Sequence, residues 1–154
     1  MDLPCRTGPK PQTSIEGSQS QLTENSSPEL WGRLMHLAIT EHNVVEGISS
    51  VSLQSSRAIF FRDLRKTVVP WTSLAPAEKR LEPVHIHGVH DTSIHLCMTT
   101  DRAQELVALG WGVMRPHSDF DTAILVYGPR DEKELQIVLG FIRESLTVAR
   151  ALNS

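Results

Sequence analysis

The chain has 154 residues, of which 40% are apolar and 21% charged, and its formal net charge is -3. These proportions are typical of one folded domain, and they exclude the basic surface that nucleic acid or an anionic membrane requires. Two cysteines, Cys5 and Cys97, offer no disulfide framework, so we expect free thiols and a cytoplasmic location. No stretch approaches the roughly 20 apolar residues of a membrane span.

The N-terminal 26 residues are rich in Ser, Gln, Thr and Gly and have few large apolar side chains. We expect residues 1–26 to form a disordered polar tail whose deletion leaves the melting temperature within a few degrees, because it buries too little to offset its ordering entropy. The folded domain is then residues 27–154. A serine, a proline and a glutamate at Ser27–Glu29 predict the start of its first helix.

The middle of the chain predicts strands and one long connection. Residues 44–53 alternate loosely, and residues 57–61 are β-branched and aromatic, which predicts two strands with a turn near residues 55–56. Residues 64–82 are interrupted by prolines and predict a long connection, with one helical turn at residues 77–80.

The C-terminal half predicts two further helices around a strand. Residues 101–109 form a helix that ends at a glycine, residues 122–127 form a strand, and residues 131–152 form the longest helix. Asp131 and Glu134 open that helix in the pattern of a capping box. We therefore predict a single α+β domain, with an antiparallel sheet packed by an N-terminal helix and a long C-terminal helix.

Four of the seven histidines, His85, His87, His90 and His95, lie within eleven residues. If residues 83–87 and 93–98 pair through a loop at 88–92, His85 faces His95 and His87 faces Ser93, with opposed Cβ atoms ~4.5–5.5 Å apart. The imidazoles then share one face of the hairpin. The other face is apolar and faces the core, and it consists of Ile86, Ile94, Leu96 and Met98.

This pattern predicts the wall of a pocket, although histidines exposed on a sheet face would give the same sequence. Imidazole exchanges protons near neutral pH and is also the most common ligand of transition metals. We expect a cluster that works without a metal. The alternative is a catalytic metal held by His85, His87 and His95, with Glu82 and Asp91 nearby.

Three motifs follow one another in a specific order. They are the string H-I-H-G-V-H-D-T-S-I-H from His85 to His95, then G-W-G at residues 110–112, then V-Y-G-P-R-D-E at residues 126–132. Together they resemble the luciferase domain of bioluminescent fungi and its relatives, whose pattern is H-x-H-x-x-H-D-x-[ST]-[LI]-H, G-W-G and Y-x-P-R-[DN]-E. The resemblance covers about residues 44–152 and includes the strand at residues 57–61.

The resemblance implies an oxygenation of a hydroxylated styryl-pyrone by O2, through a peroxidic intermediate that loses CO2, without a flavin or other dissociable cofactor. The predicted catalytic residues are His85, His87 and His95. The predicted substrate-binding residues are His90, Asp91, Trp111, Arg115, Tyr127 and Arg130. Trp111 would otherwise pack in the core, and Arg130 would otherwise form a salt bridge that fixes the last helix.

The residues that follow the G-W-G motif depart from the family pattern. Met114, Arg115 and His117 stand where the family has arginine, histidine and leucine. We therefore expect altered pocket chemistry in a non-luminous member that modifies polyketide-like or phenolic small molecules in fungal secondary metabolism. The alternatives are a metal-dependent enzyme with cupin-like chemistry and a binding protein that catalyses nothing. The sequence sets no oligomeric state.

Overall fold

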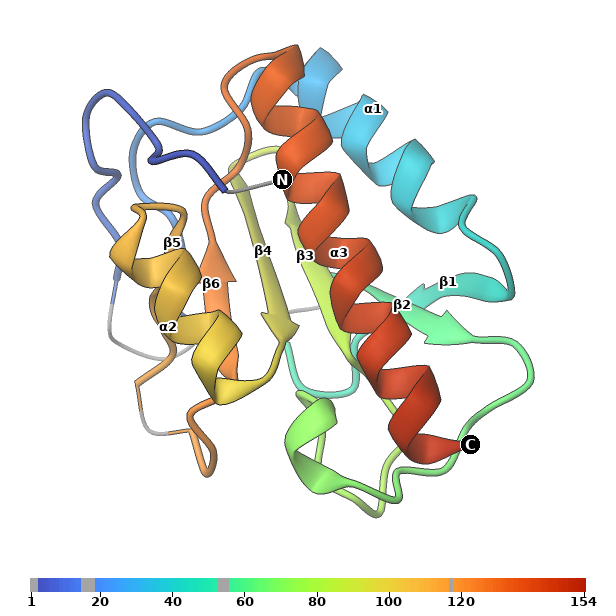
Figure 1. Cartoon of the computed structure of the whole chain (residues 1–154). Helices are drawn as coiled ribbons and strands as arrows, with labels where there is room; N and C mark the ends of the chain where they lie inside the picture. The colour runs from blue at the N-terminus through green and yellow to red at the C-terminus, as the bar shows by residue number, and fades with distance from the viewer. Residues whose placement is uncertain (1–2, 15–18, 53–55, 117) are drawn as a thin grey trace.

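The computed structural model describes residues 3–14, 19–52, 56–116 and 118–154. Figure 1 shows a single antiparallel sheet crossed by a long C-terminal helix, with two shorter helices beside it. The predicted α+β fold is therefore confirmed, including the N-terminal helix and the long last helix.

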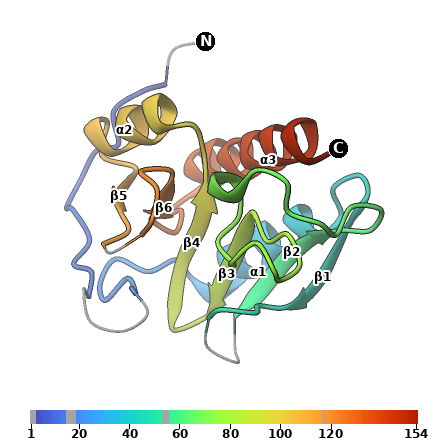
Figure 2. The same cartoon turned by 90° about the horizontal axis from the view of Figure 1, so that it is seen from below.

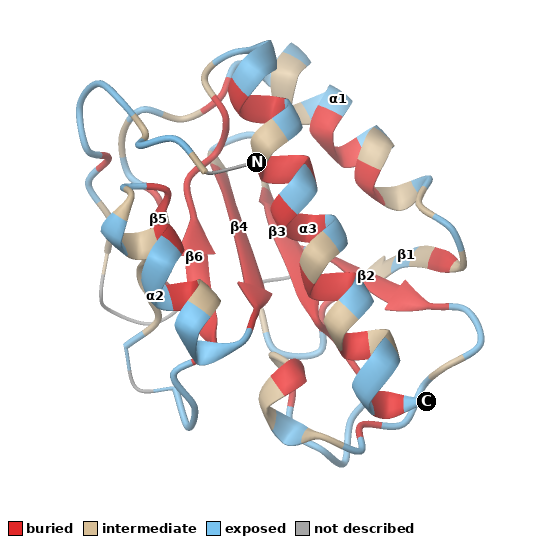
Figure 3. Cartoon of the chain, viewed as in Figure 1, coloured by how far each residue is buried: buried red, intermediate tan, exposed pale blue. Residues whose placement is uncertain are grey.

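The sheet has six strands in the order β1-β2-β3-β4-β6-β5. All neighbouring strands are antiparallel. The strands are β1 (Val44–Ile48), β2 (Arg57–Phe61), β3 (Val84–Gly88), β4 (Asp91–Cys97), β5 (Gly112–Met114) and β6 (Ala123–Val126). The central strands β3, β4 and β6 are almost entirely buried (Figure 3).

Each helix begins at a side chain that caps its first turn. The helices are α1 (Pro28–Ile39), α2 (Thr100–Ala108) and α3 (Glu132–Asn153). Ser27 caps α1 and Asp131 caps α3, as the sequence predicted, whereas α2 is capped by Thr99 rather than by Thr100 or Asp101, the two residues that the sequence favoured. These side chains accept hydrogen bonds from amides that have no partner within the helix.

The helices pack on one face of the sheet, where the main core lies. Ile86, Ile94, Leu96 and Met98 belong to this core, as the predicted alternation requires. The opposite face carries the histidines and is covered by irregular chain. Figure 2 shows α2 and α3 on one side of the sheet, with the blue N-terminal segment passing around the β5–β6 edge.

The hairpin of β3 and β4 differs from the prediction in its turn. Gly88 pairs with Asp91, so the turn has two residues instead of the predicted five. The register shifts between Ile86 and Gly88, so His87 lies opposite Thr92 and Ser93 together rather than Ser93 alone, and Ser93 Oγ lies 3.5 Å from His87 Nδ1. The physical reason is a β-bulge, which changes the pairing of every residue beyond it by one.

Three shorter elements also differ. The first strand ends at Ile48 rather than residue 53, and the predicted turn at residues 55–56 lies partly outside the described residues. The long connection contains a 3-10 helix at Pro70–Thr72 that was not predicted, and the predicted helical turn at residues 77–80 is a hydrogen-bonded turn in which Lys79 N donates to the Pro76 carbonyl at 3.0 Å. Strand β5 was not predicted, because three residues are too short to show an alternation.

The described part of the N-terminal segment lies against the domain, where we expected a disordered tail. Trp111 Nε1 donates a hydrogen bond of 2.7 Å to the Pro4 carbonyl, and Arg6 N donates one of 2.8 Å to the Leu109 carbonyl. Gln21 is 1% exposed and accepts a 2.9 Å hydrogen bond from Gly128 N. The amino-acid composition did not predict these contacts, because they are hydrogen bonds of polar residues that show no periodic pattern in the sequence.

Within the described ranges, no helix is both long enough and apolar enough to cross a membrane. Both cysteines are free thiols, as predicted, with Cys5 exposed and Cys97 buried.

Candidate functional site

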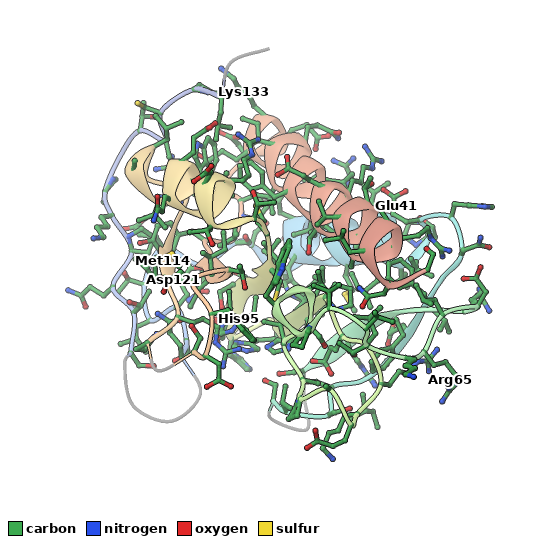
Figure 4. All side chains as sticks on the ribbon, turned by 60° about the horizontal axis from the view of Figure 1, so that its bottom comes forward. Glu41, Arg65, His95, Met114, Asp121 and Lys133 are labelled. Carbon is green, nitrogen blue, oxygen red and sulfur yellow. The ribbon has the colours of Figure 1, made fainter. Side chains whose placement is uncertain are left out.

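Three imidazoles meet on the loop-covered face of the sheet. His85 pairs with His95 across β3 and β4, as the register predicted. The ring centroids are 5.0 Å apart for His85 and His95, 5.4 Å for His85 and His87, and 4.5 Å for His87 and His95. The three residues are only 2%, 5% and 1% exposed in chain order. In Figure 4, His95 lies on the side of the sheet away from α3.

Glu82 holds the first of these rings from one side. Its carboxylate lies 2.8 Å from His85 Nδ1 and is fully buried. It also accepts hydrogen bonds of 2.6 Å from Ser49 Oγ and 2.9 Å from Ser50 N. The buried charge therefore has three partners, which fix both the carboxylate and the plane of the His85 ring.

Asp91 holds the second ring in the same way. Its Oδ2 contacts His87 Nδ1, and its Oδ1 accepts hydrogen bonds from Ser93 Oγ at 2.7 Å and Gln21 N at 3.0 Å. Burial alone would raise the pKa of Asp91, but the contacts with His87 and Ser93 lower it below its ordinary value. The carboxylate is therefore ionised at neutral pH, and it ties the N-terminal segment to the histidine cluster.

Burial keeps two of the rings neutral. It lowers the pKa of His85 below its ordinary value, although the hydrogen bond and charge of Glu82 oppose the shift. Burial also lowers the pKa of His95 well below its ordinary value, and the nearby His85, His87 and Arg115 lower it further. A neutral imidazole keeps a lone pair, which can accept a proton or bind a metal ion.

A cavity of about 400 Å³ is lined in part by Cys97 and Arg115, although none of the three clustered histidines lines it. Cys97 follows His95 by two residues on β4, so both side chains point to the same face of the sheet. Burial raises the pKa of the Cys97 thiol to about 12, which leaves it protonated and unreactive. Arg115 is partly buried, and it lies close enough for its positive charge to lower the pKa of His85 and His95.

The other predicted substrate-binding residues lie apart from this centre. His90 is exposed in the turn between β3 and β4. Trp111 packs in the main core, with its ring 5.8 Å from that of Phe141, which favours its alternative role in packing. His117, one of the departures from the family pattern, falls outside the described residues.

Tyr127 and Arg130 contact the N-terminal segment and α3. The Arg6 guanidinium lies over the Tyr127 ring at 5.1 Å from its centroid. Arg130 forms an ion pair with Glu134, the salt bridge that was its alternative role. Of the predicted substrate-binding residues, Asp91 therefore contacts the cluster directly and Arg115 affects it through its charge. Tyr127 and Arg130 contact other groups.

Sequence reasoning missed part of the support around the cluster. Gln21 and Ser49 bind the two carboxylates, but neither belongs to a motif and both come from distant segments. Glu82 had a weak signal, since it lies three residues before His85 in the sequence. A charged residue next to a predicted strand that carries histidines is a candidate partner for them.

Comparisons with known proteins agree with the motif order. The family model described as luciferase domain matches residues 80–145, which contain Glu82, the three clustered histidines and Arg115. Luciferases of Armillaria mellea and Armillaria ostoyae are each 28% identical over 164 aligned positions, which cover 94% of this chain and 60% of the relative. The luciferase of Neonothopanus nambi is 24% identical over a similar span.

The predicted resemblance to fungal luciferases is therefore confirmed: residues 80–145 match the luciferase-domain model, and the matched relatives are fungal. The chain spans about 60% of the length of the curated relatives that it matches. No solved structure matches it.

Proposed function

We propose that this protein is an enzyme that deprotonates a phenolic or pyrone-type enol at the histidine cluster and thereby prepares it for reaction with O2. The observation that carries the proposal is the cluster itself. Three buried imidazoles converge on the face of the sheet that no helix of the described chain covers, and two of them are backed by carboxylates. Three imidazoles and two carboxylates are an uncommon set in a packed core, because burying polar groups is costly unless they are paired.

His85 is the proposed proton acceptor. Its Nδ1 is held by Glu82, so its Nε2 is the nitrogen that remains for the substrate. When Nε2 takes a proton from the enol, the ring becomes positive and the adjacent carboxylate stabilises it. The same division of roles operates wherever a buried carboxylate orients a histidine base.

Arg115 and the adjoining cavity are proposed to hold the substrate. A volume of about 400 Å³ falls within the range of roughly 300–1,000 Å³ that is usual for small-molecule sites. A guanidinium beside the cluster would pair with the oxygen anion that deprotonation creates. This arrangement favours planar, acidic hydroxyl compounds such as phenols and hydroxypyrones.

The deprotonated substrate supplies the electrons for the next step. Its electron pair forms a carbon–oxygen bond to O2, and the outer oxygen becomes a peroxide anion, so that no external reductant is consumed. The matched relatives are named luciferases, which supports this oxygenase-like chemistry. We propose that the reaction needs no organic cofactor and belongs to small-molecule metabolism in a fungus.

Oxygen uptake with a hydroxylated styryl-pyrone tests the proposal. The wild-type protein should consume O2, and His85→Ala, which removes the proposed proton acceptor, should reduce the rate by about 10²–10⁴-fold, the usual contribution of a positioned acid or base. His36→Ala is the matched control, because His36 is exposed on α1, and it should keep the wild-type rate. Circular dichroism should show that both variants are folded. Uptake by the wild-type protein no faster than in a protein-free blank would contradict the proposal.

A further inference from the structure

We infer that His85, His87 and His95 bind one divalent transition-metal ion. The sequence favoured a cluster without a metal and left this site as the alternative, but the contacts of the ring nitrogens favour the ligand role. The inference rests on the proposed function and deepens it. This changes one role in the proposed function: with Nε2 of His85 bound to the ion, that ring would no longer accept the substrate proton. The ion would instead lower the pKa of the bound hydroxyl group and stabilise the resulting anion, together with Arg115.

The three side chains can reach a common point. Each offers a ring nitrogen, and these atoms all lie within 4.8 Å of one another. Imidazole nitrogens bind zinc at about 2.0–2.1 Å, so two ligands of a tetrahedral ion are about 3.4 Å apart. Small rotations of the rings, of roughly 1 Å at the nitrogens, would therefore close the site. The rings come from two adjacent strands, which keeps the backbone positions fixed.

The carboxylates have the placement of groups that orient metal ligands. Histidine ligands commonly donate the other ring N–H to a carboxylate, which fixes the tautomer and makes the free nitrogen more basic. Here Glu82 contacts Nδ1 of His85, and Asp91 contacts Nδ1 of His87. Both carboxylates are themselves held by further hydrogen bonds. In both residues the nitrogen that remains for a metal is Nε2.

Several ring nitrogens at this point have no partner. Within the described part of the chain, His87 Nε2 and both nitrogens of His95 are buried and make no hydrogen bond of good geometry, although the backbone of Gln19 lies close enough to His95 to oppose the lowering of its pKa. His95 is 1% exposed, so bulk water does not compensate for the missing bonds. A buried polar group without a partner is costly, and three such atoms in one place indicate a ligand. A metal ion would satisfy one nitrogen of each ring.

The ligand type and the local charge select the kind of ion. Three imidazoles without a direct carboxylate ligand suit zinc, iron(II) or cobalt(II), and they do not suit magnesium or calcium, which prefer oxygen. The negative charges of Glu82 and Asp91 would offset the positive charges of the metal ion and of Arg115. Three protein ligands leave a coordination position for a substrate oxygen.

Metal binding by the full-length chain tests the inference without any substrate. The chelator-stripped protein should bind one Zn²⁺ per chain in isothermal titration calorimetry, and Co²⁺ should produce the visible absorption of a low-coordinate nitrogen site. His95→Ala should weaken Zn²⁺ binding at least 100-fold, more than the roughly 10–100-fold effect of an orienting group. His95→Gln, which preserves more of the side-chain volume, should weaken it similarly. His36→Ala should bind like the wild type.

The outcomes separate this inference from the proposed function. Wild-type protein that binds less than one Zn²⁺ per chain, or folded His95 variants that bind as tightly as the wild type, would overturn the metal site. If the protein binds no metal but cluster variants still lose oxygen uptake, the inference fails and the proposed function stands. If the protein binds the metal but consumes no oxygen, the metal site stands and the proposed function fails.

Discussion

Replacing Glu82 by glutamine would separate the shape of this buried group from its charge. One carboxylate oxygen accepts from Ser50 N, and the other contacts both Ser49 Oγ and His85 Nδ1. Glutamine can keep its carbonyl oxygen on Ser50 N. Its amide nitrogen then takes the position of the second oxygen, where it faces His85 as a donor.

This exchange would reverse the tautomer of His85. An amide NH₂ donates to Nδ1, so the proton of the ring moves to Nε2, which can then neither accept a substrate proton nor bind a metal ion. A charge-assisted hydrogen bond contributes about 1.5–3 kcal/mol and a neutral one about 0.5–1.5 kcal/mol. Three such bonds change, and the lower cost of burying a neutral amide offsets part of the loss, so the unfolding free energy should fall by about 1–3 kcal/mol. Oxygen uptake should fall by about 10²–10⁴-fold.

Urea unfolding and oxygen uptake should be measured on the same preparations. Glu78→Gln is the matched control, because Glu78 is exposed in the same connection between strands and should change neither quantity. A folded Glu82→Gln protein with the wild-type rate of oxygen uptake would refute the orienting role of Glu82. A loss of several kcal/mol of stability would instead show that Glu82 acts mainly in folding.

Two further predictions concern stability. Gln21→Ala leaves Gly128 N buried without its acceptor and should lower the unfolding free energy in urea by about 1–3 kcal/mol; no change would support a free tail. Burial alone would raise the pKa of Glu134, but its contacts with Arg130 and the charge of Arg6 outweigh this effect and hold the pKa below the ordinary 4.5. The ionised carboxylate therefore stabilises the fold fully above pH 4.5, and this stabilisation is lost as the pH falls through the pKa of the folded state. Glu134→Gln should therefore cost about 1–3 kcal/mol at pH 7 and progressively less as the pH falls below 4.5, and a cost that does not change with pH would contradict this ionic role.

The sequence was sufficient to predict the pairing at the centre of the site. The alternation of histidine and isoleucine on β3 and β4 determines which side chains share a face, because side chains alternate along a strand. The same reasoning predicted the apolar face that packs under α3. The bulge between Ile86 and Gly88 was not predictable, since a single extra residue leaves no periodic signal.

The support of the site was less predictable than its centre. Ser49 and Gln21 reach the two carboxylates from segments more than 30 residues away along the chain. Such contacts depend on how loops cross the sheet, and this is set by packing rather than by local pattern. The N-terminal segment illustrates the same limit, because its composition resembles a disordered tail while Gln21 is buried against the domain.

Deprotonation of the bound substrate is the step on which the proposed function most depends. It can be measured directly from the absorption spectrum of a hydroxylated styryl-pyrone, bound without O2 at a pH well below the pKa of the compound in solution. We predict that the wild-type protein binds the compound with the spectrum of its anion, and that His85→Ala either binds it with the spectrum of the neutral form or fails to bind it. The spectrum of the neutral compound on the wild-type protein would contradict the assignment of the histidine cluster as the site of proton removal.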